Sequence, residues 1–306
     1  MIIVSIIGIL MLRFIGQNLE RGQITFLLLF ASICSIHEIF KGNTLKGASL
    51  LALGINIKLM PVVFILYLIY RAKFKAALWV LFFLAILFIA PLLIWGVEHS
   101  LFLHQTWWEA INPNKVKHAF ENKDGLYNLS SFIPAYFSDL GSNMGIELPR
   151  NILSLNENQV LVMTHISRLI LVLFTIYFLR TWPFKAPKGN YNILWELSYI
   201  CLVIPLIFPR QSKYAYLFLL PAVFYLVYYL YFQIRQAQGI SQNNIRVVLT
   251  TLILYFILAN LTSINIIGRD LYNLSQYYKS ITFGVFFLLM GLALSNPKNI
   301  LQIPKH

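Results

Sequence analysis

The stretch "LALGINIKLMPVVFILYLIY", residues 51–70, decides the fold class. It is almost wholly apolar, yet Lys58 lies near its middle and Pro61 follows three residues later. An α-helix needs about 20 apolar residues to cross the ~30 Å hydrocarbon core of a bilayer. Runs of this kind recur along the chain. The sequence therefore predicts an all-α, polytopic transmembrane helical bundle.

We expect about eight to nine membrane segments. The first is partial, because the N-terminal run "MIIVSIIGILML" meets Arg13 before it is long enough to span the bilayer. For this reason we expect that upstream sequence is missing. The remaining segments are predicted near 23–40, 47–70, 74–96, 160–180, 193–209, 213–232, 246–266 and 280–295.

The composition supports a membrane protein and argues against several other classes. Of the 306 residues, 58% are hydrophobic and 11% are charged, whereas a soluble domain carries about 25% charged residues. The net charge of +13 is spread through short connections, which is typical of membrane topology control and not of a nucleic-acid surface. Cys34 and Cys201 lie inside apolar runs, so neither a disulfide framework nor a metal site is indicated.

One connection, residues 97–158, is too long and polar to be a turn. It holds seven of the eleven acidic residues: Glu98, Glu109, Glu121, Asp124, Asp139, Glu147 and Glu157. The positive-inside tendency places the basic clusters "RAKFK" (71–75) and "LRTWPFKAPK" (179–188) in the cytoplasm. We therefore expect 97–158 to be an external loop, inserted in a single integral-membrane domain of residues 1–306.

Lys58 is the most informative polar residue. In one continuous helix over 47–70 it would lie roughly 18 Å from either end, too far for its side chain to reach the interface. A charge at that depth costs at least about 2.5–3.5 kcal/mol, so it should face protein, water or an anion. Pro61 predicts a broken helix here, with Asn56 nearby. Two interpretations stay open: binding of a phosphate, or pairing with a buried carboxylate such as Glu196.

Two further constellations carry polar groups. Gly22 and Gln23 stand before the apolar run 25–40, where a helix start would leave free backbone N–H groups for a polar ligand. The alternative is ordinary capping, with Arg21 at the lipid headgroups.

The second is "FPRQSKYAYLFLLPA", residues 208–222, where Arg210, Gln211 and Lys213 interrupt two apolar spans. They form a plausible anion-binding mouth, with Tyr214 and Tyr216 available to stack on a sugar ring. Equally, these residues are typical of a membrane interface.

Together these motifs resemble glycosyltransferase family 87. "NLERGQITFLLLF" (18–30) carries the family's Gly-Gln pair at Gly22 and Gln23, and "GINIKLMPVVFILYLIYRAKFKAAL" (54–78) carries its Lys-x-x-Pro helix, followed by basic residues. "GLYNLSSFIPAYF" (125–137) is similar to its external loop, with Asn128 and Ser130. The resemblance implies a C-type glycosyltransferase fold and a polyprenyl-phosphate sugar donor, typically of mannose.

The resemblance also implies a catalytic carboxylate after the first transmembrane helix. No counterpart is found, so we expect the carboxylate to lie upstream of Met1, with Asp124 or Glu109 as the fallback, or else an inactive chain. The family's histidine near the late polar break is also missing, and Tyr214 and Tyr216 stand near that place.

The predicted function is transfer of a mannose-like sugar from a polyprenyl phosphate to a glycan or glycolipid acceptor on the external face, at a bacterial inner membrane. The partners are the donor, the acceptor and the lipid bilayer, with no nucleic acid, cofactor or metal. The donor phosphate is assigned to Lys58, Arg210 and Arg21, and other polar contacts to Gln23, Asn56, Gln211 and Asn128. Two alternatives stay open: a transporter or flippase of a lipid-linked sugar, and a structural membrane subunit.

Overall fold

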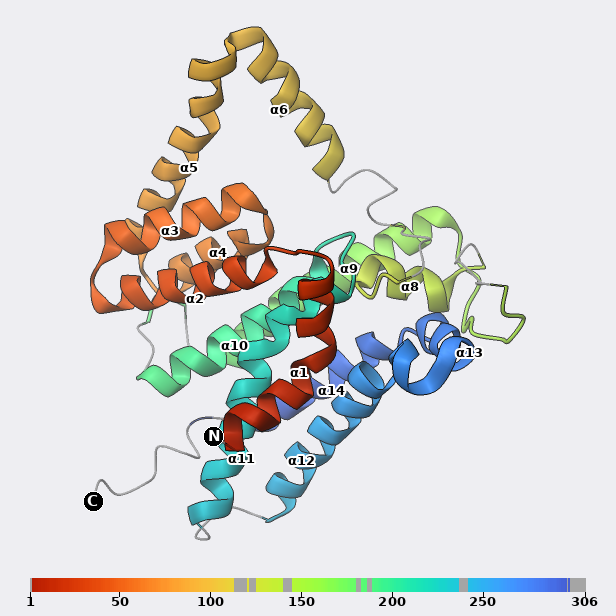
Figure 1. The fold of residues 1–306 in the computed structure, drawn as a ribbon. Coiled ribbons are helices and arrows are strands. Elements are labelled where there is room, and N and C mark those ends of the chain that lie inside the picture. The colour runs from red at the N-terminus through yellow and green to blue at the C-terminus, as the bar shows by residue number, and fades with distance from the viewer. Residues whose placement is uncertain are drawn as a thin grey trace. The chain divides into compact units, whose positions relative to one another are not determined.

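The computed structural model describes residues 2–112, 120, 125–139, 145–179, 183–185, 189–236, 242–295 and 297. Within these ranges the chain forms 13 α-helices, with short 3₁₀ and π turns between some of them and one isolated β-bridge (Figure 1). The predicted all-α fold is confirmed. The chain divides into two compact units, which are described in turn.

Unit 2 comprises Ile24–His118 and Thr181–Ala186. Its elements are α2 (Thr25–Lys41), α3 (Thr44–Ile57), the 3₁₀ turn η1 (Met60–Val62), α4 (Val63–Tyr70), α5 (Phe74–Trp95) and α6 (Val97–Ile111). Helices α2 and α3 lie side by side, and α5 and α6 form an open V (Figure 1). The V turns at Gly96, whose φ of 74° belongs to the left-handed region that favours glycine.

A close approach of backbones holds α2 against α3. A Cβ atom added to Gly47 would lie 2.7 Å from the Ser35 carbonyl oxygen and 2.6 Å from Ile39 Cγ1. The Ser35 hydroxyl donates to the Gly47 carbonyl oxygen at 2.8 Å. Glycine is therefore required at this point of α3.

Unit 1 comprises Met1–Gln23, Ala119–Arg180 and Pro187–His306. Its helices are α1 (Ile2–Glu20), α8 (Leu129–Phe137), α9 (Glu157–Leu179), α10 (Asn190–Ile207), α11 (Leu220–Gln236), α12 (Gln242–Phe256), α13 (Ile264–Tyr277) and α14 (Ser280–Leu294). The 3₁₀ segment η2 (Lys213–Leu219) precedes α11, and the π turn η3 (Ile257–Leu261) follows α12. The core of unit 1 lies around η2 and α11, where most side chains are buried.

The predicted number of eight to nine membrane segments is wrong. Among the described residues, five helical segments are long and apolar enough to cross a membrane: Ile2–Glu20, Phe74–Trp95, Glu157–Leu179, Lys213–Gln233 and Asn244–Leu261. A sixth is possible if α13 and α14, bent by 68°, count as one broken span. These helices indicate an integral membrane protein.

The difference arises because several apolar runs do not form one long helix. The predicted span 47–70 is broken into α3, η1 and α4, and α3 has 14 residues. At 1.5 Å per residue, α3 rises only ~21 Å. The predicted span 193–209 gives one helix, whose apolar part Tyr191–Ile207 is too short to count as a candidate span.

The N-terminal helix is longer than predicted. Arg13 does not end it, because α1 continues to Glu20 and is long enough to span. The Arg13 guanidinium donates from Nη1 to the Ala259 carbonyl oxygen at 2.6 Å and to the Thr262 hydroxyl at 2.7 Å. These bonds replace water around the charge, which lets the helix carry an arginine within an apolar run.

The long connection 97–158 contains two of the helices, α6 and α8. Its position on the external side, like the single-domain assignment of 1–306, stays a prediction.

Candidate functional site

The polar break, residues 208–213, separates two buried helical segments of unit 1. Helix α10 ends at Ile207, Phe208 is extended, and η2 begins at Lys213. Arg210, which is exposed, has a φ of 56°. The helical path is therefore interrupted between α10 and η2.

Residues 126–128 brace the polar break from far away in sequence. Leu126 forms an antiparallel bridge with Ser212, and the Tyr127 amide donates to the Gln211 carbonyl oxygen at 3.2 Å. Asn128 Nδ2 donates to the Phe208 carbonyl oxygen at 2.9 Å. Two predicted site residues, Asn128 and Gln211, therefore belong to the same hydrogen-bonded segment pair.

Asn128 and Gln211 differ in what their amides can still bind. The Asn128 side chain is buried, and its Oδ1 caps α8 by accepting from the Ser131 amide at 3.1 Å. Gln211 Nε2 donates to the Pro209 carbonyl oxygen at 2.6 Å. Gln211 Oε1 is buried and has no donor within the described part of the chain. Because a buried acceptor without a donor costs about 1–3 kcal/mol, Gln211 is the better candidate for a ligand hydroxyl.

Three cations gather beside the polar break. Lys213 Nζ donates to the Tyr272 hydroxyl and lies 4.4 Å from the centroid of that ring. Arg13 and Arg21 both lie within electrostatic range of Lys213. We call Arg13, Arg21 and Lys213 the cationic cluster; Arg13 lies on α1, Arg21 follows the end of α1, and Lys213 is the first residue of η2.

Among the described residues, one carboxylate, that of Glu20, influences Lys213 electrostatically. Glu20, the last residue of α1, acts on Lys213, and its Oε2 accepts from Gln17 Nε2 at 2.7 Å. Three cations against one carboxylate leave an excess of positive charge, which suits a phosphate group.

The sequence interpretation missed Arg13 as a site residue and left Lys213 undecided. The signal in the sequence was an arginine within an apolar run, the same signal that singled out Lys58. What the sequence does not reveal is the partner, because Arg13 and Lys213 meet only through the fold.

The prediction that Tyr216 stacks on a sugar is wrong. Its ring is fully buried and packs against Phe14 at 5.9 Å and Tyr127 at 6.2 Å between centroids. Tyr216 belongs to the core because η2 turns it inward. Tyr214 is half-buried, and its carbonyl oxygen accepts from Asn18 Nδ2 at 2.9 Å.

The prediction of a helix start at Gly22 and Gln23 is also wrong. Helix α2 begins at Thr25, and Gly22, with a φ of 57°, ends α1. The Gly22 amide donates to the Leu19 carbonyl oxygen at 3.2 Å, and the Gln23 amide to that of Asn18 at 2.9 Å. This is the Schellman pattern of a helix C-terminus, so the two N–H groups are occupied.

In unit 2 the predicted break at Lys58 is confirmed. Helix α3 ends at Ile57, Lys58 is extended with φ −154° and ψ 129°, and Pro61 lies in η1. The Lys58 side chain is half-buried. Its assignment to a phosphate, like the alternative pairing with Glu196, stays a prediction.

The predicted fallback carboxylates differ in what is known of them. Glu109 is exposed on α6 of unit 2. Asp124 lies outside the described residues. Within the described residues, no group of three or more His, Cys, Asp or Glu side chains is placed to hold a metal ion.

Comparison with known proteins identifies the family. No curated protein and no solved structure matches the chain. Residues 2–209 match glycosyltransferase family 87. The matched region begins in α1, includes the helix break at Lys58 and ends within the polar break. The match covers well over half of the 306 residues and includes two members of the cationic cluster, Arg13 and Arg21. The chain therefore belongs to glycosyltransferase family 87.

Proposed function

We propose that the protein transfers a mannose-like sugar from a polyprenyl-phosphate donor to a hydroxyl of a glycan or glycolipid on the external face of a bacterial inner membrane. Family membership implies transferase activity. The observation that supports a phosphate-bearing donor is the cationic cluster of Arg13, Arg21 and Lys213 beside the polar break.

The chemistry explains why cations are needed. The acceptor oxygen forms a bond to the anomeric carbon of the sugar while the bond from that carbon to the phosphate oxygen breaks. The acceptor proton passes to a base, and the polyprenyl phosphate leaves with an added negative charge. Lys213 and Arg21 would stabilise this charge as it develops, in a site partly shielded from water. Lys58 and Arg210 remain the predicted additional phosphate ligands.

A second set of groups would position the sugar. Gln211 offers a buried carbonyl oxygen that a sugar hydroxyl could satisfy. Asn128 would act through the break that it braces, since both ends of its amide are already bonded within the protein. Gln23 and Asn56 keep their predicted polar contacts.

The structure adds a candidate for the catalytic base. Glu20, the last residue of α1, lies within electrostatic range of Lys213 and is exposed to incoming acceptors. A general base must be close to the leaving phosphate and reachable by the acceptor hydroxyl. Glu20 therefore joins Asp124 and Glu109 as the groups to test.

The test measures transfer of radiolabelled mannose from polyprenyl-phosphate mannose in membranes that hold the full-length gene product. Removing one donor that stabilises a developing negative charge lowers turnover by about 10²–10³. We expect Lys213→Gln to lose transfer by about that factor and Lys58→Ala to lose it as well. Arg246→Gln, which removes an exposed cation on α12, should stay within about twofold.

Three outcomes would decide the assignment. Equal activity in Lys213→Gln and Arg246→Gln would remove the cationic cluster from the mechanism. Loss of transfer in Glu20→Gln, with donor binding intact, would identify Glu20 as the base. Absence of transfer in the well-folded wild-type protein would contradict the assignment of polyprenyl-phosphate mannose as the donor.

One observation favours the alternative of a transporter or flippase for a lipid-linked sugar. Helices α13 and α14 form a pair bent by 68°, and α3 and α4 are interrupted at Lys58, as in the discontinuous helices of transporters. Movement of labelled donor across sealed vesicles without any transfer would favour that function.

A further inference from the structure

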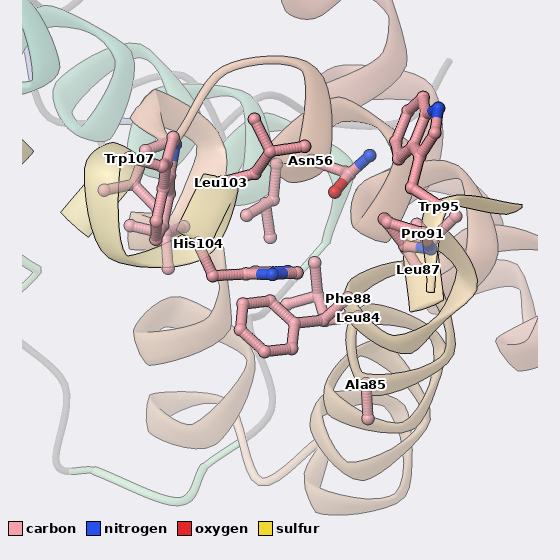
Figure 2. Close-up of a pocket in the computed structure, with 13 residues that line it drawn as sticks. Asn56, Leu84, Ala85, Leu87, Phe88, Pro91, Trp95, Leu103, His104 and Trp107 are labelled. Atoms are coloured by element: carbon pink, nitrogen blue, oxygen red, sulfur yellow. The ribbon is translucent and has the colours of Figure 1, made fainter. Parts of the chain in front are cut away.

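A cavity of about 580 Å³ lies within unit 2, between the end of α3, η1, α5 and α6 (Figure 2). Its size falls in the range of small-molecule sites. It is lined by Ile55, Asn56, Leu59, Val62, Leu84, Ala85, Leu87, Phe88, Pro91, Trp95, Leu103, His104 and Trp107. We call it the unit 2 cavity.

The lining of the unit 2 cavity is free of charge, in contrast to the cationic cluster. None of its residues, all within the described part of the chain, is acidic, lysine or arginine. A phosphate bound there would lack a counter-charge in surroundings where charge is expensive. The cavity therefore suits a neutral ligand.

Two tryptophans stand at opposite sides of the unit 2 cavity (Figure 2). Trp95 is 54% exposed and Trp107 is 48% exposed, so both rings offer free faces. An aromatic face carries partial negative charge and attracts the C–H groups on the flat side of a sugar ring. Each indole also has one N–H group to donate.

His104 supplies an acceptor between the two tryptophans. Its Nδ1 lies 2.6 Å from the Ser100 carbonyl oxygen, which can only accept, so Nδ1 carries the proton in the neutral ring. Nε2 then keeps its lone pair. The ring lies against Phe88, with centroids 3.8 Å apart, and this contact fixes its position in the cavity.

In the part of the chain that the structure describes, the polar groups of the unit 2 cavity are not engaged by the protein itself and are available to a ligand. Within the ranges that the structure describes, no hydrogen bond engages the Asn56 amide, His104 Nε2 or the indole N–H groups of Trp95 and Trp107. Together they present both donors and acceptors around an apolar space. A sugar ring matches this set, because it has apolar faces and a rim of hydroxyls that both donate and accept.

The α5 side of the unit 2 cavity suits an alkyl chain attached to the sugar. Leu84, Leu87 and Phe88 belong to α5, a candidate membrane span, and Trp95 is the last residue of that span. Tryptophans concentrate at the membrane interface. One end of the cavity is thus hydrocarbon-like, whereas the end near Trp95 is polar and aromatic.

We propose that the unit 2 cavity binds the sugar headgroup of a lipid-linked acceptor, with its alkyl segment along α5. This assignment rests on the proposed glycosyltransferase function. The sugar would stack on Trp95 or Trp107, and Asn56 and His104 would hydrogen-bond its hydroxyls.

The test is equilibrium binding of tritiated n-octyl mannoside, below its micellar concentration, to the full-length protein in nanodiscs. Trp107→Ala and His104→Ala should each weaken binding about tenfold, since each removes a contact worth about one such factor. The matched controls are Trp108→Ala and His99→Ala on the same helix, neither of which lines the cavity. These should stay within about twofold.

Competition separates the sugar from the alkyl chain. Unlabelled octyl mannoside should displace the probe at a concentration at least about tenfold lower than 1-octanol does. Equal competition by 1-octanol would show an alkyl site and overturn the proposal. Equal effects of the cavity variants and their controls, or no saturable binding, would also overturn it.

The binding assay is independent of transfer. Because no donor is present, the Lys213→Gln protein should bind octyl mannoside like the wild type. A protein that binds the probe in this way but transfers no sugar from polyprenyl-phosphate mannose would contradict the proposed function and not the cavity. Photocrosslinking of a diazirine-bearing octyl mannoside to residues 97–112 of the wild-type protein gives a second readout that needs no variant.

Discussion

The cationic cluster of unit 1 and the cavity of unit 2 both lie at breaks between helices, yet their chemistry is opposite. The cluster gathers Arg13, Arg21 and Lys213, whereas the cavity is lined by aromatic, aliphatic and neutral polar side chains. Breaking a helix frees space and polar backbone in both places. The side chains around the break then decide whether it suits an anion or a neutral sugar.

Both helix breaks contain a proline, but their surroundings differ. Pro61 follows Lys58 in the break of unit 2, and Pro209 precedes Arg210 in the polar break of unit 1. Each removes a backbone donor and so ends a helix. In unit 1, however, residues 126–128 brace the break, and the cations come from two segments almost 200 positions apart, α1 with the residue after it and η2. The concentration of positive charge at this site therefore depends on how the chain folds.

The largest expected effect is a reversal of charge in the cluster. Lys213→Glu would place a carboxylate against the leaving phosphate and lower sugar transfer by about 10³ or more. Octyl mannoside binding should be unchanged within about twofold, because the cavity contains no part of the cluster. A parallel loss of both activities would break the distinction between the two regions.

The next effect concerns the frame of unit 2. Gly47→Ala would push a methyl group against the Ser35 carbonyl oxygen and Ile39, and we expect a loss of about 1–3 kcal/mol in the free energy of unfolding. Octyl mannoside binding should then fall at a lower temperature than in the wild type. The control is Gly8→Ala on α1, where nothing lies within 4 Å of the added Cβ. A similar shift in both variants, followed by thermal denaturation, would contradict this explanation.

A smaller effect is expected at the brace of the polar break. Asn128→Ala leaves the half-buried Phe208 carbonyl oxygen without its donor and removes the cap of α8, at a cost of about 1–2 kcal/mol. Transfer should fall about tenfold, with octyl mannoside binding retained. Asn151→Ala is the control, since it removes a half-exposed bond to the Ser138 carbonyl oxygen. Wild-type transfer in Asn128→Ala would show that the brace does not position the break.

The smallest effect is expected for a surface cation in unit 2. Lys46 forms an exposed ion pair with Glu38 at 3.5 Å, and such pairs contribute little or nothing measurable. Lys46→Gln should leave the thermal midpoint, sugar transfer and octyl mannoside binding unchanged. A loss of transfer comparable to that of Lys213→Gln would mean that general positive charge, and not the cluster, supports the reaction.

Local patterns in the sequence predicted the class of the protein. Apolar runs indicated membrane helices because hydropathy acts residue by residue, and Pro61 predicted the break at Lys58 because it removes a local hydrogen bond. Short motifs around Gly22, Lys58 and Asn128 indicated the family, which the match over residues 2–209 confirms.

The same local reasoning failed where the neighbours were distant. Counting apolar runs overestimated the membrane segments, because it treated 47–70 as one span in spite of the break that Pro61 predicts. It also took the N-terminal run as partial, although α1 continues past Arg13. The arginine is tolerated through bonds to Ala259 and Thr262, almost 250 positions away in sequence. Gly22 was likewise assigned to a helix start, although its φ of 57° ends α1.

By itself, the sequence determined that this is a helical membrane protein of glycosyltransferase family 87, since composition and short motifs carry that information. Only the tertiary structure decided that Arg13 and Arg21 come within electrostatic range of Lys213, and that His104, Trp95 and Asn56 surround one cavity. The reason is physical: a site for charge or sugar depends on distances between side chains, and residues far apart in sequence acquire such distances only when the helices pack.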